Sequence, residues 1–257
     1  MLEPDLSTSS NNTNDESGLY KSTATNTGDA TYYFRGNVEN NYISFAGFTW
    51  RIVRINEDGT IRIIMQDGIN NNTSYQFNSS SNNYAYMYYT NSNIKDVLEN
   101  WYDVNIGNYN SYASKIMMGE YFCEQAKVKY MGYTSNTSMI EYSSYLPNFK
   151  CNTDANEKGI INSNIGLLTY DEVVYAGGYY NENNVFYYLN NSNIYWWTMS
   201  PSGCNYGYSY EWFINPNSSI QTNGIDNVYC IRPVLNLKTD TQAIGNGTSS
   251  KPYVVIN

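Results

Sequence analysis

Histidine is absent from this chain of 257 residues. Its absence excludes nucleophile systems that use an imidazole base, zinc sites built on imidazole, and pH switching by histidine. Positive charge is also scarce, because 14 Lys and Arg residues oppose 23 Asp and Glu residues and the formal net charge is -9. Binding to nucleic acid or another polyphosphate requires clustered Lys and Arg, so no such partner is expected.

Long apolar runs are also missing. No run approaches the roughly 18 residues that cross a bilayer, so no membrane-spanning segment is predicted. The first residues show no basic segment followed by an apolar stretch, so no signal peptide is predicted within the chain. For an exported protein, we expect the export signal or a membrane anchor to lie outside these residues.

Charged residues make up only 14% of the chain, against roughly 25% in an ordinary soluble domain. Neutral hydrogen-bonding residues replace them, since the chain holds 40 asparagines and 29 tyrosines. Tyr supplies rigid amphipathic contact area and Asn supplies adaptable hydrogen bonds, a combination typical of recognition surfaces. The alternative interpretation is simply a secreted protein with an uncharged surface.

The four cysteines are Cys123, Cys151, Cys204 and Cys230. No two of them have CxxC spacing, and no histidine is present to complete a zinc site. An even number in an acidic, Asn-rich chain favours two disulfides in an oxidising compartment, with three connectivities open. Pairing of sequence neighbours would join Cys123 to Cys151 and Cys204 to Cys230. Four buried free thiols are the alternative.

Composition and pattern predict one boundary, which divides the chain into two segments. Residues 1–30 are polar, with few large apolar side chains, and are expected to be a flexible leader or linker. Residues 31–257 are expected to form one domain in which short helices lie between β hairpins, which is an α+β architecture.

Hydrophobic periodicity and turn signals predict the individual elements. A hairpin is expected around Glu57–Gly59, between two β-rich runs. One helix is expected to begin at Ser92 or Asn93, and another is expected over 169–176 behind a capping box. Further strands are expected at 208–214, 231–237 and 253–256, and residues 67–91 are expected to be a polar loop.

No active site stands out. Glu120, Glu141 and Glu211 would serve as the acid and base of a glycosidase only if folding brought two of them together. Asp171 and Glu172 fall in the first turn of a predicted helix, where their effect on the helix dipole is sufficient explanation.

Calcium has two weak candidate segments, residues 56–59 (NEDG) and residues 154–157 (DANE). Neither fits the EF-hand loop pattern, and both are typical of turns. We therefore expect no metal site and no cofactor; calcium stays open as an alternative that these segments do not support.

Five short phrases resemble the C-type-lectin-fold domains of bacterial surface proteins, close to the formylglycine-generating-enzyme-like branch of that fold. They also resemble the retroelement-diversified variable proteins of gut Firmicutes. The phrases are Phe45–Ile55 (FAGFTWRIVRI), Gly166–Thr169 (GLLT), Asp171–Gly178 (DEVVYAGG), Trp196–Pro201 (WWTMSP) and Ile231–Leu237 (IRPVLNL). The resemblance spans most of the chain from residue 32 onward and implies a C-type-lectin-like ligand-binding fold.

In such proteins the stretch between the WW-type and RPV-type strands displays side chains on an exposed face. The resemblance therefore implies twelve ligand-binding residues here: Asn205, Tyr206, Tyr208, Tyr210, Trp212, Asn215, Asn217, Ser218, Asn223, Asp226, Asn227 and Tyr229. A bond between Cys204 and Cys230 would fasten both ends of this stretch. Trp196, Trp197 and residues 231–237 would then be scaffold.

Two departures from the family limit what is implied. The calcium-dependent sugar motifs of animal lectins are absent, since the nearest stretch, Asn215–Asn217, lacks a carboxylate. The cysteine pair that carries formylglycine-generating chemistry is not recognisable either, so that activity is not expected.

The sequence thus predicts an extracellular, non-catalytic recognition domain, an adhesin or variable receptor. Its expected partner is a glycan or protein on a host or bacterial surface. A structural surface or pilus-tip module is one alternative, and a carboxylate-dependent carbohydrate-active enzyme is another.

Overall fold

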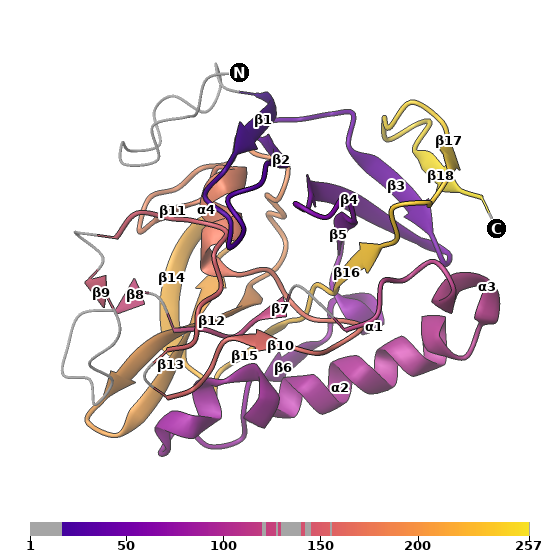
Figure 1. Ribbon diagram of the computed structural model, residues 1–257. Coiled ribbons are helices and arrows are strands. Elements are labelled where there is room, and N and C mark those ends of the chain that lie inside the picture. Colours follow the sequence, from indigo (N-terminus) through magenta and orange to yellow (C-terminus); the bar gives the residue numbers. More distant parts are fainter. Residues whose placement is uncertain are drawn as a thin grey trace.

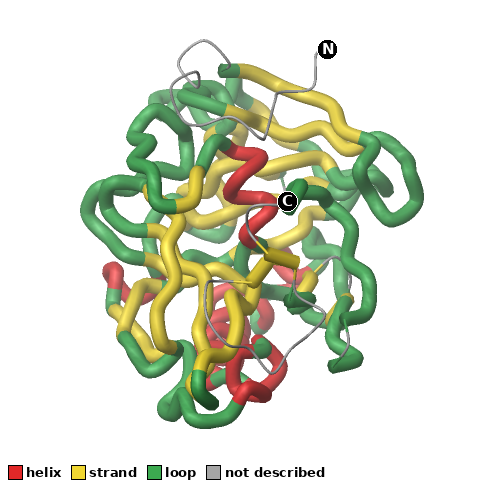
Figure 2. Tube along the Cα trace, turned by 90° about the vertical axis from the view of Figure 1, so that its left-hand side faces the viewer, coloured by secondary structure: helices red, strands yellow, loops and turns green. Residues whose placement is uncertain are grey.

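The computed structural model describes residues 17–119, 122–126, 128–129, 140–141, 145–154 and 156–256. They form a mixed α+β structure with two large sheets and a few short helices (Figure 1). Figure 2 shows that strands and loops make up most of the trace. The predicted α+β class is confirmed.

The first sheet has eight strands in the order β1-β2-β4-β3-β18-β17, with β5 between β4 and β16. All pairs are antiparallel except β18 with β3. The strands are β1 (Gly18–Ser22), β2 (Thr31–Arg35), β3 (Tyr42–Phe45), β4 (Phe48–Ile55), β5 (Ile61–Met65), β16 (Val234–Leu237), β17 (Ala243–Ile244) and β18 (Tyr253–Val255). The hairpin predicted around residues 57–59 is confirmed as β4–β5, and the predicted last strand is confirmed as β18.

Strand β1 lies within the segment that was predicted to be a flexible leader. It pairs with β2 over five residues, and the ring of Tyr20 stacks on that of Tyr33 at 5.8 Å. The prediction was therefore wrong from Gly18 onward. The prediction rested on the polar composition of the whole segment, which gave no weight to two of its large apolar residues, Leu19 and Tyr20. Both lie in β1, which extends the edge of the sheet by pairing with β2.

The second sheet has six strands in the order β11-β14-β13-β12-β15-β6. Its centre is the antiparallel meander of β12, β13 and β14. The strands are β6 (Ser74–Gln76), β11 (Tyr179–Tyr180), β12 (Trp196–Asn205), β13 (Tyr208–Ile214), β14 (Ser219–Gly224) and β15 (Val228–Cys230). Two short pairs lie apart: β7 (Phe122–Cys123) with β10 (Ile160–Ile161), and β8 (Val128–Lys129) with β9 (Ile140–Glu141).

Both predicted helices are confirmed. In α2 (Asn93–Tyr102) the Ser92 hydroxyl accepts a hydrogen bond from the backbone of Lys95 at 3.2 Å. In α4 (Tyr170–Ala176) the capping box of Thr169 and Glu172 is present. The remaining helical elements are α1 (Ile69–Asn72), α3 (Asn110–Ala113), the 3-10 turns η2 (Tyr84–Met87) and η3 (Tyr89–Asn91), and the π-helical turn η4 (Asp103–Gly107).

The polar loop predicted over residues 67–91 is wrong in part, because it contains α1, β6 and two 3-10 turns. Strand β6 joins the edge of the second sheet by pairing with β15, about 150 residues further along the chain. Sequence pattern alone did not reveal this distant partner.

All five arginines are buried, and four of them, Arg35, Arg51, Arg62 and Arg232, donate to backbone carbonyls. Arg35 donates to the carbonyls of Val174 and Tyr175 at 2.8 and 3.0 Å, which satisfies the C-terminal end of α4. Arg232 donates to the carbonyls of Leu189 and of Met65, the last residue of β5, and its guanidinium lies 4.8 Å from the Trp196 ring centre. Because every arginine is internal, the exposed positive charge comes from lysine alone.

The disulfide prediction is confirmed for one pair and wrong for the other. Cys123 and Cys151 are bonded, whereas Cys204 and Cys230 are buried free thiols. Cys230 pairs in register with Trp196, at the other end of β12 from Cys204. At roughly 3.3 Å per residue the two Cα atoms are about 25 Å apart, far beyond the roughly 7 Å limit of a disulfide.

Thiol counting tests this pairing. We expect two reactive thiols per chain in denaturant without reductant, and four after reduction, because only one bond is present. Maleimide labelling followed by mass spectrometry measures both numbers. Labelling of none before reduction would contradict the free state of Cys204 and Cys230.

Candidate binding surface

The β12–β13 hairpin carries the most exposed of the predicted binding residues. Asn205 and Tyr208 pair across it, and Tyr206 and Gly207 form a two-residue turn in which both φ angles are positive, 50° and 85°. Such a turn matches the twist of the adjoining strands. Tyr206 is 77% exposed and Tyr208 is 54% exposed, so the turn presents two phenols to solvent.

Six of the twelve predicted residues gather at this end of the second sheet. Tyr210 pairs with Gly224, which places the turn that follows β14 beside the hairpin. Asp226 in that turn accepts a hydrogen bond from the Ser81 hydroxyl at 3.2 Å. We name the group the hairpin-end surface; it comprises Asn205, Tyr206, Tyr208, Tyr210, Asp226 and Asn227, all partly or fully exposed.

Two predicted residues are in the core. Trp212 follows Tyr208 and Tyr210 on the same side of β13 but is fully buried, with its ring 4.8 Å from that of Tyr170 in α4. Ser218 is also fully buried and donates to the Asn190 side chain. Their assignment to ligand binding was wrong: α4 covers Trp212, whereas Ser218 lies in the turn between β13 and β14 against Asn190.

Asn223 and Tyr229 lie on the other side of the sheet. Asn223 pairs with Glu211 and donates to the Tyr229 hydroxyl at 2.6 Å. The Tyr229 ring stacks on Phe213 at 4.5 Å and on Tyr195 at 5.4 Å. Burial raises the pKa of the Tyr229 phenol, so it stays protonated at neutral pH.

Tyr195 is 48% exposed and was missed from the sequence, where only its neighbours Trp196 and Trp197 were considered. It lies beside Tyr229 because β12 and β15 run parallel, and the Tyr195 carbonyl accepts the Cys230 amide at 2.8 Å. Alternation of side chains along β12 could have predicted the side of the sheet on which Tyr195 lies. The sequence did not predict that β15, which carries Tyr229, is the neighbouring strand.

Asn215 and Asn217 are separated from the hairpin-end surface. They form the turn between β13 and β14, at the opposite end of a seven-residue strand and so about 20 Å away. Asn215 accepts the backbone amide of Ser219 at 3.0 Å, which is a local turn contact. The twelve residues therefore occupy four places rather than one face: the hairpin-end surface, the core, the other side of the sheet, and the turn between β13 and β14.

A separate cavity of about 470 Å³ lies beside the disulfide, with Phe122 and Phe149 among its walls. Glu172 contacts Arg62 Nε at 2.5 Å and Arg54 Nε at 3.2 Å, and Arg54 also contacts Glu57 at 3.3 Å. The positive charges of Arg54 and Arg62 are thus balanced by the negative charges of Glu57 and Glu172. The two cysteines that line the cavity, Cys123 and Cys151, are bonded to each other, so neither offers a free thiol there.

Burial raises the pKa of Glu172, but attraction to Arg62 and Arg54 outweighs it and the pKa is lowered. Glu172 is therefore an ionised structural anchor. From the sequence, Glu172 was assigned to the capping box and to the helix dipole, but not to an ion pair. Two arginines on a β-rich run, Arg54 and Arg62, were the available signal for that pair.

Of the three candidate catalytic carboxylates, only that of Glu211 lies in the part of the chain that the structure describes. Glu211 is fully buried, and its two carboxylate oxygens have no hydrogen-bond partner. Burial raises the pKa of Glu211 well above its ordinary value, and repulsion from Glu124 adds to the effect. Glu120 and the side chain of Glu141 lie outside the described residues.

Both calcium candidates are turns, as predicted. Gly59 donates its backbone amide to Asn56, and Asp58 accepts from Thr60. Asp154 accepts the backbone amides of Asn156 and Lys158 at 2.8 and 3.0 Å. Within the described ranges, no three His, Cys, Asp or Glu residues come together as a metal site would require.

Comparison of the chain with protein-family models, with curated proteins and with solved structures found no match in any of the three. In the described part of the chain, every helix is too short or too polar to cross a membrane.

Proposed function

We propose that this chain is an extracellular, non-catalytic recognition domain with a C-type-lectin-like fold, which binds a glycan or a protein through the hairpin-end surface. The observation that carries the proposal is the display of Tyr206 and Tyr208 on a two-residue hairpin turn. Phenols held on a preformed turn supply contact area with little loss of conformational entropy on binding.

The backbone of Tyr206 adds support. Its φ of 50° is rare for a bulky residue, and Asn or Gly is the usual choice at this position of such a turn. Strained residues of this kind concentrate at functional sites. The Tyr206 side chain therefore has a use that offsets its conformational cost, and ligand contact is that use.

The Cys123–Cys151 disulfide supports the proposed extracellular location, because such bonds persist in oxidising surroundings outside the cytosol. A surface adhesin or a variable receptor fits a chain whose exposed polarity comes mostly from Asn and Tyr rather than from charge.

Substitution of Tyr206 and Tyr208 by Ala tests the proposal. We expect binding to arrayed glycans or to immobilised epithelial surface proteins to fall at least tenfold, while the free energy of unfolding changes by no more than about 0.5 kcal/mol. Array fluorescence measures the first, and urea unfolding measures the second.

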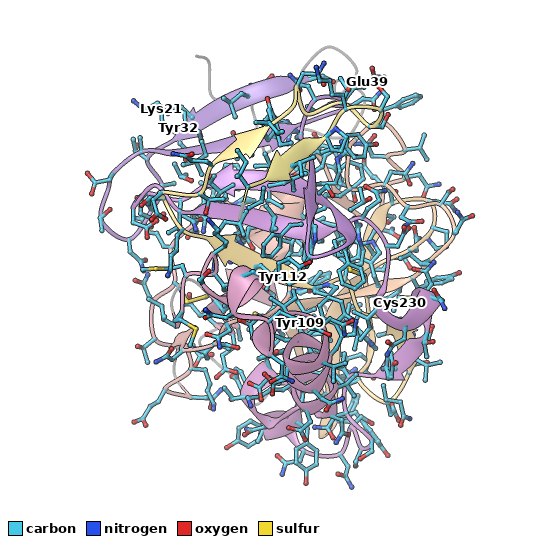
Figure 3. The ribbon with its side chains drawn as sticks, turned by 90° about the vertical axis from the view of Figure 1, so that its right-hand side faces the viewer. Lys21, Tyr32, Glu39, Tyr109, Tyr112 and Cys230 are labelled. Atoms are coloured by element: carbon cyan, nitrogen blue, oxygen red, sulfur yellow. A yellow bond between two sulfur atoms is a disulfide. The ribbon has the colours of Figure 1, made fainter. Side chains whose placement is uncertain are left out.

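Tyr109→Ala is the matched control, because Tyr109 is 52% exposed and lies beside Tyr112 in the region of α3. This region faces the viewer in Figure 3 and lies at the right of Figure 1, whereas the β12–β13 hairpin lies at the lower left of Figure 1. Equal binding by the double variant and the control would refute the assignment of the surface.

A further inference from the structure

We propose that a polar cleft beside α1 is a second binding site, one that takes one or two rings of a neutral sugar. The cleft has a volume of about 570 Å³ and lies between α1, the start of β4 and the end of α2. None of its residues belongs to the hairpin-end surface, so this inference does not depend on the function proposed above.

One wall of the cleft is an unusual backbone segment. Asn70, Asn71 and Asn72 have φ angles of 50°, 58° and 62°, so three successive non-glycine residues are left-handed. Left-handed conformations normally occur in single residues, because in L-amino acids the Cβ atom comes too close to the following carbonyl oxygen. Asn bears this conformation better than most residues, because its short amide forms local hydrogen bonds.

Neighbouring groups hold the segment in place. The Asn72 side chain accepts the Gly68 amide at 2.6 Å, and the Asn70 side chain donates to the Tyr75 hydroxyl at 2.7 Å. Cys230 donates its thiol to the Asn72 carbonyl at 3.0 Å. The Asn71 side chain is exposed and has no hydrogen-bond partner among the described residues, so its amide is available to a ligand.

The floor of the cleft is aromatic. The rings of Phe48 and Trp101 contact each other with centres 5.1 Å apart and planes inclined by 54°. Thr49 adds a hydroxyl near them, and Asn105 adds an amide oxygen, since its amide nitrogen donates to the Trp101 carbonyl at 2.8 Å. A pyranose ring has an apolar C–H face and a rim of hydroxyls, so it matches an aromatic floor bordered by neutral donors and acceptors.

Charge at the cleft narrows the ligand class. Its lining contains no Lys or Arg, so a phosphate, sulfate or carboxylate would have no counter-charge there. Its single carboxylate, Asp67, already accepts from the Asn191 amide at 3.2 Å. A hard cation requires more oxygen ligands with charge than this. Neutral, hydroxyl-rich compounds remain as the complementary class.

The site is tested by titrating the full chain with the methyl glycosides of glucose, galactose, mannose and N-acetylglucosamine. ¹H–¹⁵N NMR spectra recorded at each step of the titration measure the binding. We expect at least one glycoside to shift the side-chain amides of Asn71 and Asn105 and the indole of Trp101, with saturation at millimolar concentration. The Tyr206→Ala, Tyr208→Ala double variant is expected to titrate like the unaltered chain.

Asn71→Gly is the decisive variant, because glycine keeps the left-handed backbone while the amide is lost. It should weaken binding about tenfold, as removal of one well-placed hydrogen bond does. Asn105→Ala should also weaken it. Asn181→Gly is the control, since Asn181 is exposed and left-handed (φ 55°) but does not line the cleft. Absence of any shift, or shifts that persist unchanged in Asn71→Gly, would overturn the proposal.

Discussion

Glu172→Gln is expected to lower the free energy of unfolding by about 3–5 kcal/mol, which is the usual cost of breaking a buried ion pair from one side. The Glu172 carboxylate contacts two buried arginines, Arg54 and Arg62, whose side chains are 7% and 1% exposed. The substitution removes this negative charge from both arginines, whereas the ion pair of Arg54 with Glu57 remains. Glutamine still serves in the capping box, so the loss reflects the charge rather than the cap.

Urea unfolding of the two proteins at neutral pH measures the difference. Glu39→Gln is the control, because Glu39 is exposed, lies at the upper edge of the molecule in Figure 3, and should change stability by less than about 0.5 kcal/mol. Similar losses in the two variants would show that the buried network does not anchor α4.

The pH dependence of this difference has a definite sign. The folded-state pKa of Glu172 is lowered, so its contribution is present above the unfolded value near 4.5 and is lost as the pH falls through the folded value. The gap between the unaltered chain and Glu172→Gln should therefore narrow in acid.

Glu211→Gln is expected to act in the opposite sense. The folded-state pKa of Glu211 is raised by burial, so the folded protein retains a proton that the unfolded chain releases above pH 4.5. Stability then falls by about 1.4 kcal/mol for each pH unit between the unfolded and folded pKa values. Glutamine does not titrate, so the variant escapes this loss.

Unfolding free energies measured across this pH range for both proteins test the prediction. Their difference should be flat below pH 4.5 and should then move in favour of Glu211→Gln as the pH rises. Parallel curves would show that Glu211 reaches a partner or solvent in the folded state, and would remove the case for a neutral buried carboxyl.

Local patterns determined much of the secondary structure. The cap at Ser92 and the capping box of Thr169 and Glu172 depend on groups three residues apart, so they can be recognised without knowledge of the fold. The β4–β5 hairpin is local for the same reason. The even count of cysteines predicted disulfides but left three connectivities open; the structure contains one bond, Cys123–Cys151, which joins sequence neighbours.

The sequence also predicted the alternation of side chains along β13, but not which residues on each side are exposed and which are buried. The same side of the strand carries Tyr208, which is half exposed, and Trp212, which is fully buried. Sequence identifies which residues share a side; only the packing of α4 decides where that side passes from solvent into the core.

The sequence by itself determined the α+β class, the main helices, the central hairpins and the scarcity of groups that commonly perform catalysis. Tertiary structure alone decided that the predicted binding residues divide among four places, that Tyr195 lies beside Tyr229, and that Asn71 borders a cleft. These outcomes depend on pairings such as β12 with β15 and β6 with β15, which join residues far apart in the chain. Local β-propensity does not predict such partners, because the packing between cross-strand side chains that selects them is formed only when the strands pair.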